Sequence, residues 1–225
     1  MSLAEGPAAA RDELVALLNM MQRVLGREHP DTLTTRSELA RLTGEAGDAA
    51  GARDQLAALL PVLDAVLGRE HPDTLTARSE LARWTGEAGN YDAAREQFAR
   101  LLPLRIRILG PQHPRTLAVG TSLAYWTGRA GDPFRARDLY IRLLPVHEQV
   151  FGPDHPRTLN LRANLAASMG EAGDAAAACD EYAELLPLHE KVLGPEHPDT
   201  QAVRRGLALW SKQAGRRQKK WRRDK

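Results

Sequence analysis

Cysteine and aromatic residues are scarce in this chain, and long apolar runs are absent. Its 225 residues include one cysteine, Cys179, and 5% aromatic residues. A single cysteine excludes an internal disulfide framework, and its place on an expected helix favours a small buried side chain over a nucleophile. No apolar segment approaches the roughly 20 residues that span a bilayer, and residues 1–13 lack the basic and apolar regions of a secretory signal. These absences predict a cytoplasmic protein without a membrane span.

Recognisable catalytic motifs are also missing. The sequence contains no P-loop, no GxGxxG turn between a strand and a helix, and no GxSxG or HExxH motif. We therefore expect no enzyme activity, no catalytic residues and no cofactor.

What the chain has instead is an internal repeat with a period of 42 residues. The segment LGREHPDTL and its variants recur without insertion or deletion at 25–33, 67–75, 109–117, 151–159 and 193–201. Residues 7–24 align with 49–66, so the array opens on half a repeat. A fixed period of this length predicts stacked units that bury their apolar faces against one another rather than in a central core.

Glycine and proline predict two helices in each unit. In the first unit, helix formers extend from Thr32 to Ala46, and a second stretch extends over about 49–67 after Gly47 and Asp48. The next helix opens at His71 and Pro72, because proline suits the first helical position, where the N–H has no helical partner. A further proline lies midway along the second helix of four units, which predicts either a regular kink or a helix break, at Pro61, Pro103, Pro145 and Pro187.

Small and large apolar residues recur at fixed offsets. The pair Leu39-Ala40 and its equivalents mark a buried stripe on the first helix. Small residues such as Ala40, Gly44 and Ala52 would let helices approach closely. One position of the second helix carries larger side chains that would fill the space between helices, namely Leu56, Phe98, Tyr140 and Tyr182.

The spacing of Leu81-Ala82, Gly89, Ala94 and Phe98 resembles the tetratricopeptide repeat family. The 42-residue length and the LGPxHP linker are similar to its kinesin-light-chain-like subclass, common in actinobacterial proteins. The resemblance covers nearly the whole chain. It implies an all-α, right-handed solenoid of five helix-turn-helix repeats over residues 1–214, followed by a basic tail at 215–225. It also implies a protein-protein interaction scaffold or adaptor. Because such arrays often follow a nucleotide-binding switch domain, a sensor or regulatory region of a larger protein is an alternative.

In the family, the first helices line a concave groove that binds a protein or peptide partner. The residues at these offsets vary between units, whereas the scaffold repeats. They are Thr34, Ser37, Arg41, Glu45, Thr76, Ser79, Arg83, Glu87, Thr121, Tyr125, Arg129, Asn160, Asn164, Glu171, Arg205 and Leu209. Many family members carry an asparagine before the leucine to grip a peptide backbone. Here only Asn164 does so, and a peptide, a helix and a folded protein are all candidate partners.

Histidine and tryptophan also recur with the repeat. The five histidines of the His-Pro pairs fall in five different units, and His147 and His189 have no ligand-forming neighbours at suitable spacing. We expect structural roles for them and no metal site. Trp84, Trp126 and Trp210 share one repeat position, which predicts core packing, whereas partial exposure would make them an anchor row for a partner.

The last eleven residues carry a net charge of +6, while the whole chain carries +2. The candidate tail residues are Arg216, Arg217, Lys219, Lys220, Arg222 and Arg223. Such a tail could be a solvated end, a contact for nucleic acid or anionic lipid, or a segment that docks on an acidic surface of another copy. We favour the solvated end over nucleic-acid binding and expect the solenoid to fray here. The repeat ends could also support a homo-oligomer.

Overall fold

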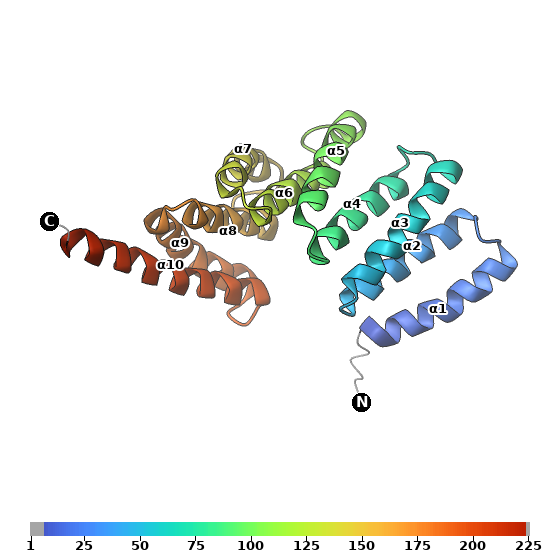
Figure 1. Ribbon diagram of the computed structural model, residues 1–225, viewed down its shortest axis with the longest axis horizontal. Coiled ribbons are helices and arrows are strands. Elements are labelled where there is room, and N and C mark those ends of the chain that lie inside the picture. The colour runs from blue at the N-terminus through green and yellow to red at the C-terminus, as the bar shows by residue number, and fades with distance from the viewer. Residues whose placement is uncertain (1–6, 224–225) are drawn as a thin grey trace. The chain divides into compact units, whose positions relative to one another are not determined.

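The computed structural model describes the backbone of residues 7–223 and the side chains of residues 12–216. Within these limits the chain forms ten α-helices and no strand (Figure 1). They are α1 (Pro7–Val24), α2 (Pro30–Glu45), α3 (Ala49–Val66), α4 (Pro72–Glu87), α5 (Tyr91–Leu109), α6 (Pro114–Arg129), α7 (Pro133–Phe151), α8 (Pro156–Glu171), α9 (Ala175–Leu193) and α10 (Pro198–Arg223). The even-numbered helices are the first helices of the five repeats, and the odd-numbered helices are second helices. This confirms the predicted all-α solenoid.

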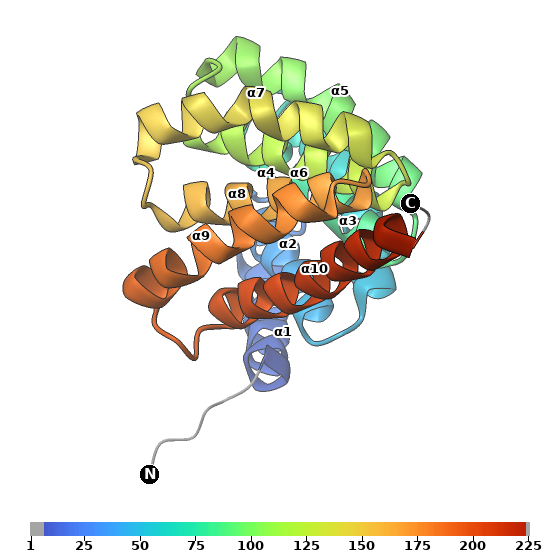
Figure 2. The same cartoon turned by 90° about the vertical axis from the view of Figure 1, so that its left-hand side faces the viewer.

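The helices group into two compact units, Met1–Pro111 (unit 1) and Gln112–Lys225 (unit 2). Within each unit, every helix packs against the next along the chain, and neighbouring first helices touch: α2 with α4, α6 with α8, and α8 with α10. Figure 2 shows α8, α9 and α10 side by side in unit 2. In unit 1, α1 packs on α2 as a lone second helix, which confirms that the array opens on half a repeat.

The His-Pro pairs start the first helices. In α2 the proline is the first helical residue, and Nδ1 of His29 accepts a hydrogen bond from the N–H of Asp31 at 3.2 Å. The same bond forms at His71, His113, His155 and His197. A side-chain acceptor at this position satisfies one of the backbone donors that a helix start leaves unpaired. The structural role predicted for these histidines is therefore confirmed.

A tight turn joins the first helix to the second. In the first repeat, Gly47 has φ +102°, a left-handed conformation that other residues rarely adopt. Its N–H reaches the carbonyl of Gly44, and the N–H of Asp48 reaches that of Thr43, at 2.9 and 3.1 Å. The Asp48 carboxylate then accepts a bond from the N–H of Gly51 at 2.8 Å and caps α3.

The prolines inside the second helices do not end them. Helices α3, α5, α7 and α9 continue through Pro61, Pro103, Pro145 and Pro187. The helix-break alternative is wrong. Each proline removes one backbone bond, and the packing of the helix against the adjacent helices of its own unit offsets that loss.

The core follows the predicted positions with two exceptions. The alanines equivalent to Ala40 are fully buried in four repeats, and the larger residues at the position of Leu56 are buried in all four second helices that carry them. Trp84, Trp126 and Trp210 are also buried, so they are core residues and not an exposed anchor row. In contrast, most leucines at the position of Leu39 are only half-buried. Cys179 is half-buried as well, with Sγ 3.1 Å from Oγ of Ser211, so its predicted burial is wrong.

The C-terminal helix is longer than its repeat requires. Helix α10 has 26 residues, whereas the other first helices have 16. The expected fraying at Gly215 is wrong, because the backbone remains helical to Arg223. Arg216 is exposed. The side chains of Arg217, Lys219, Lys220, Arg222 and Arg223 lie outside the described residues.

Candidate partner-binding surface

In unit 1, the first helices place the predicted groove residues on an accessible face. Thr34 and Glu45 of α2 are exposed, as are Thr76 and Glu87 of α4, while Ser37, Arg41, Ser79 and Arg83 are half-buried. A hollow of about 160 Å³ lies between the two helices. It is lined by the predicted residues Thr34, Ser37, Arg41 and Thr76, and by Glu38, Asp73, Ala77 and Glu80. The other four predicted residues of unit 1 lie outside it.

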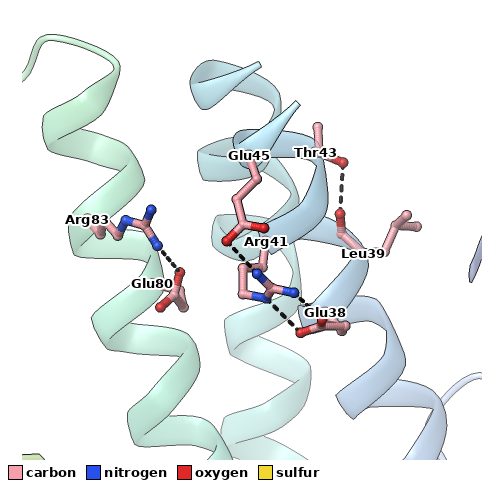
Figure 3. A network of polar contacts seen from close by, with 7 residues as sticks. All are labelled: Glu38, Leu39, Arg41, Thr43, Glu45, Glu80 and Arg83. Carbon is pink, nitrogen blue, oxygen red and sulfur yellow. Dashed lines mark hydrogen bonds and ion pairs between the residues drawn. The ribbon is translucent and has the colours of Figure 1, made fainter. Parts of the chain in front are cut away.

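A polar network ties the side chains of this face together (Figure 3). Arg41 donates hydrogen bonds to Glu38 and Glu45 on its own helix. Arg83 lies 3.6 Å from the Glu80 carboxylate. Both arginines are therefore neutralised by neighbouring carboxylates, and Glu38, Glu45, Asp73, Glu80 and Glu87 outnumber them. The face is acidic, which favours a partner with lysine or arginine side chains.

Two glutamates of this network differ in environment. The hydrogen bond from Arg41 lowers the pKa of Glu38. Burial raises the pKa of Glu80, with the Arg83 charge opposing the shift. One oxygen of Glu80, Oε2, is buried without a hydrogen-bond partner, so a cationic group entering the hollow would stabilise this carboxylate. Glu38 and Glu80 occupy the repeat position of Asn164, one residue before the leucine, and are not in the predicted groove set. Their recurrence one residue before the leucine is the signal that could have included them.

Unit 2 carries two further hollows between first helices. One, of about 60 Å³, lies between α6 and α8 and brings together the predicted residues Tyr125, Arg129, Asn164 and Glu171. Here Arg129 donates to the Tyr125 hydroxyl at 2.9 Å, and burial raises the pKa of Glu171. The other, of about 240 Å³, lies between α8 and α10 and includes the predicted Asn160 and Asn164 with Ala163, Tyr182, Asp199, Ala202 and Val203. Arg205 and Leu209 are exposed on α10, outside both hollows.

Two buried histidines contact residues of the predicted groove set. His147 Nε2 lies 3.3 Å from the Thr121 hydroxyl, and His189 Nε2 lies 3.4 Å from Oδ1 of Asn160. Each histidine also bonds a backbone carbonyl of its own helix through Nδ1, at 3.1 Å. Asn160 in turn donates to Asp199 at 3.0 Å. The histidines are thus structural, as predicted, but they also orient groove residues, which the sequence did not reveal.

The His147 ring should make stability depend on pH. Burial lowers its pKa from the ordinary 6.5, against the opposing hydrogen bond to Leu143. The neutral ring therefore contributes in full above pH 6.5, and this stability is lost as the pH falls toward the folded-state pKa. We expect His147→Leu, which installs the residue of the equivalent Leu63, to flatten the dependence of melting temperature on pH between about 5 and 7. An unchanged slope in that variant would show that other groups set the dependence.

Metal and membrane sites are not evident in the portion of the chain that the structure describes. No three His, Cys, Asp or Glu side chains gather there as ligands for a metal ion. Among the described helices, none has both the length and the apolar character to cross a bilayer.

Antiparallel helix pairs, repeated every 42 residues and capped at the same positions, define a helical-repeat protein. The chain belongs to the tetratricopeptide repeat family. Two family models match, both described as tetratricopeptide repeat. One matches residues 32–73, 74–115 and 158–199, and the other matches residues 116–178. Repeats of this family generally mediate protein–protein interactions and are generally not catalytic.

The fold is similar to solved structures of kinesin-light-chain-like proteins, as predicted. TPR-like repeats of a kinesin light chain from Podosopora anserina are 26% identical, with a TM-score of 0.70 over 85% of this chain and 90% of that chain. BtubC (BKLC) from P. vanneervenii is 18% identical, with a TM-score of 0.74 over 95% and 85%. MamA protein is 14% identical, with a TM-score of 0.54 over 84% and 89%. The last two likenesses bear on the fold alone. No curated protein sequence matches the chain.

Proposed function

We propose that the chain is a non-catalytic scaffold or adaptor of the cytoplasm that binds a protein or peptide partner on the exposed faces of its first helices. The observation that carries this proposal is the hollow between α2 and α4. Its lining combines accessible hydroxyl groups with charged side chains, at offsets where other repeats carry different residues. The scaffold positions of the same helices are buried and recur. A constant core with a varied accessible face is what a tuned binding surface requires.

The charges on unit 1 and the side chains on unit 2 suit different parts of a partner. The unit 1 face has five carboxylates and two arginines that those carboxylates already engage, so we infer that it takes a basic segment. The smaller hollow of unit 2 offers the Tyr125 ring and the Arg129 guanidinium, residue types that often anchor interfaces. Asn164 is the lone asparagine at the position before the leucine, where many family members grip a peptide backbone, so a helix or folded partner is favoured over an extended peptide.

Affinity capture from a native lysate tests this assignment. The groove variant carries Glu38→Ala, Glu80→Ala, Tyr125→Ala and Arg129→Ala, because these side chains line the hollows and Arg41 is engaged by its own helix. The control variant carries four exposed changes on second helices, Asp54→Ala, Phe134→Ala, Arg135→Ala and Glu148→Ala. We expect recovery of the partner to fall at least about tenfold with the groove variant and to stay unchanged with the control.

Equal losses in both variants, or equal recovery, would contradict the groove assignment once circular dichroism shows that both are folded. Recovery of the chain alone would point to self-association. For that outcome the candidate surface is α1, where Leu17 is 42% exposed although its repeat equivalent Leu59 is 1% exposed. Recovery of nucleic acid that vanishes with salt would instead favour the basic tail.

A further inference from the structure

A second concavity in unit 1 lies on the other side of α4 from the groove residues. Its volume is about 150 Å³, and its lining comes from α3, α4 and α5, which follow one another in unit 1 (Figure 1). At roughly 100° per residue, positions 78 and 81 of α4 point some 140–160° away from Thr76. This cleft is therefore separate from the proposed partner-binding surface.

The lining of the cleft combines an apolar wall with three polar side chains. Four leucines line it, Leu60, Leu81, Leu101 and Leu104, together with Arg78, Gln97 and Arg100. The volume is comparable to that of an engineered apolar cavity that accepts benzene, so the cleft can hold a group of about six heavy atoms. A few polar groups on an apolar wall are typical of small-ligand sites.

In repeat four, carboxylates of the protein itself bind the arginine at the position of Arg78. The equivalents of Arg78, Gln97 and Arg100 are Arg162, Glu181 and Glu184. Nε of Arg162 donates to Glu181 at 2.7 Å, and its Nη2 lies 3.5 Å from Glu184. In that repeat, carboxylates carried by the second helix therefore bind the arginine of the first helix.

In the second repeat those two carboxylates are replaced and the arginine is only partly satisfied. Nη2 of Arg78 contacts both oxygens of Asp64 at 2.7 Å, but its Nε is buried without a hydrogen-bond partner. Oε1 of Gln97 is likewise buried and unpartnered. The Arg100 side chain is 81% exposed and meets only Glu96, at 3.3 Å. Two of the lining side chains, Arg78 and Gln97, thus each hold a buried polar atom without a hydrogen-bond partner, and Arg100 adds a second guanidinium.

We propose that this cleft binds a small carboxylate that carries an adjacent N–H donor and a branched apolar group, as in an N-acyl leucine. The carboxylate would take the place of Glu181 and Glu184 and accept from Arg78 and Arg100. The N–H would donate to Oε1 of Gln97, and the apolar group would contact the four leucines. A free N-acyl amino acid and the C-terminal residue of a peptide share this chemistry.

Calorimetric titration of the full chain tests the proposal with N-acetyl-L-leucine as the probe and N-acetyl-L-leucinamide as its neutral counterpart. We expect saturable binding of the acid and binding of the amide weaker by at least roughly tenfold, because the amide cannot form the charged hydrogen bonds. A hexapeptide that ends in leucine, with a free or amidated C-terminus, distinguishes the two sources. Tighter binding of the free-ended peptide than of N-acetyl-leucine assigns the site to a chain terminus, and weaker binding assigns it to a free small molecule.

Variants that exchange the two repeats provide the control. Gln97→Glu with Arg100→Glu installs the residues of repeat four, whose carboxylates would occupy Arg78, and binding should disappear while the helical signal remains. Glu181→Gln with Glu184→Arg installs the residues of repeat two and should add a second site in unit 2. The proposal is overturned if millimolar N-acetyl-leucine gives no binding heat, if the amide binds equally well, or if the Gln97→Glu, Arg100→Glu variant binds as the unmodified chain does.

Discussion

Replacing Gly44 with alanine should destabilise unit 1 by about 1–3 kcal/mol, although alanine is the better helix former. A Cβ at position 44 would lie 2.5 Å from the ring of Trp84, closer than side-chain carbons approach in proteins. Trp84 is a buried member of the unit 1 core, so the ring would have to leave its place between α2 and α4. The loss is measurable as a lower midpoint of chemical denaturation and faster amide exchange in α2 and α4.

The same repeat position in unit 2 supplies a control with the opposite expected sign. A Cβ at Gly128 would meet only the Cβ of Ala136, at an ordinary 3.4 Å. The following first helix, α8, carries Ser168 where α4 carries tryptophan. Gly128→Ala should therefore stabilise by up to about 1 kcal/mol through helix propensity.

A second substitution separates the clash at Gly44 from other effects. Trp84→Leu, which copies the equivalent Leu42, should make Gly44→Ala nearly neutral when the two changes are combined. A destabilisation by Gly44→Ala that persists in the Trp84→Leu background would show that the ring is not its cause.

The fold was predictable because the information that defines it is local and repeated five times. Gly47 ends a first helix and His71-Pro72 opens the next, and both act through backbone geometry that a sequence displays directly. The tryptophan position was predictable for a related reason: the large residue recurs with the scaffold, and Trp84 and Trp210 meet a glycine at the same repeat position, Gly44 and Gly170.

The candidate surfaces were less predictable because they depend on contacts between repeats that differ. The offsets located the α2 and α4 faces, but not the hollow between them, because it depends on how two repeats pack against each other. The ion pairs of Arg41 with Glu38 and Glu45 lie within one helix at i,i+3 and i,i+4 spacing, so the sequence could have indicated them. The contact of His147 with Thr121 joins residues 26 positions apart and follows from packing alone. The continuation of α10 past Gly215 also escaped the pattern, because repeat register says where a helix should end and not whether the residues that follow can extend it.

Replacing Tyr182 with alanine should have the largest effect on unit 2, with a loss of about 3–5 kcal/mol, as for other buried aromatic residues. The ring is buried between α8 and α10 in the core of that unit. Its hydroxyl donates to the carbonyl of Ala163 in α8 at 3.0 Å, and on the α10 side a Cβ at Gly206 would lie 2.6 Å from the ring carbon Cζ. Burial raises the pKa of Tyr182 to about 12, so the hydroxyl remains a donor at neutral pH. The side chain therefore joins three helices through packing and one hydrogen bond.

Tyr182→Phe separates the contribution of the ring to stability from that of the hydroxyl. It keeps the ring and removes the bond to Ala163, so the free energy of unfolding should fall by only about 0.5–1.5 kcal/mol. Because Tyr182 also lines the hollow that contains Asn160 and Asp199, the alanine variant should weaken any partner bound there, whereas the phenylalanine variant should retain it. Denaturation midpoints of the three proteins, read with amide exchange in α8 and α10, measure both effects. Equal losses in the two variants would assign the stabilisation to the hydroxyl and would contradict a role for the ring in holding α8 and α10 together.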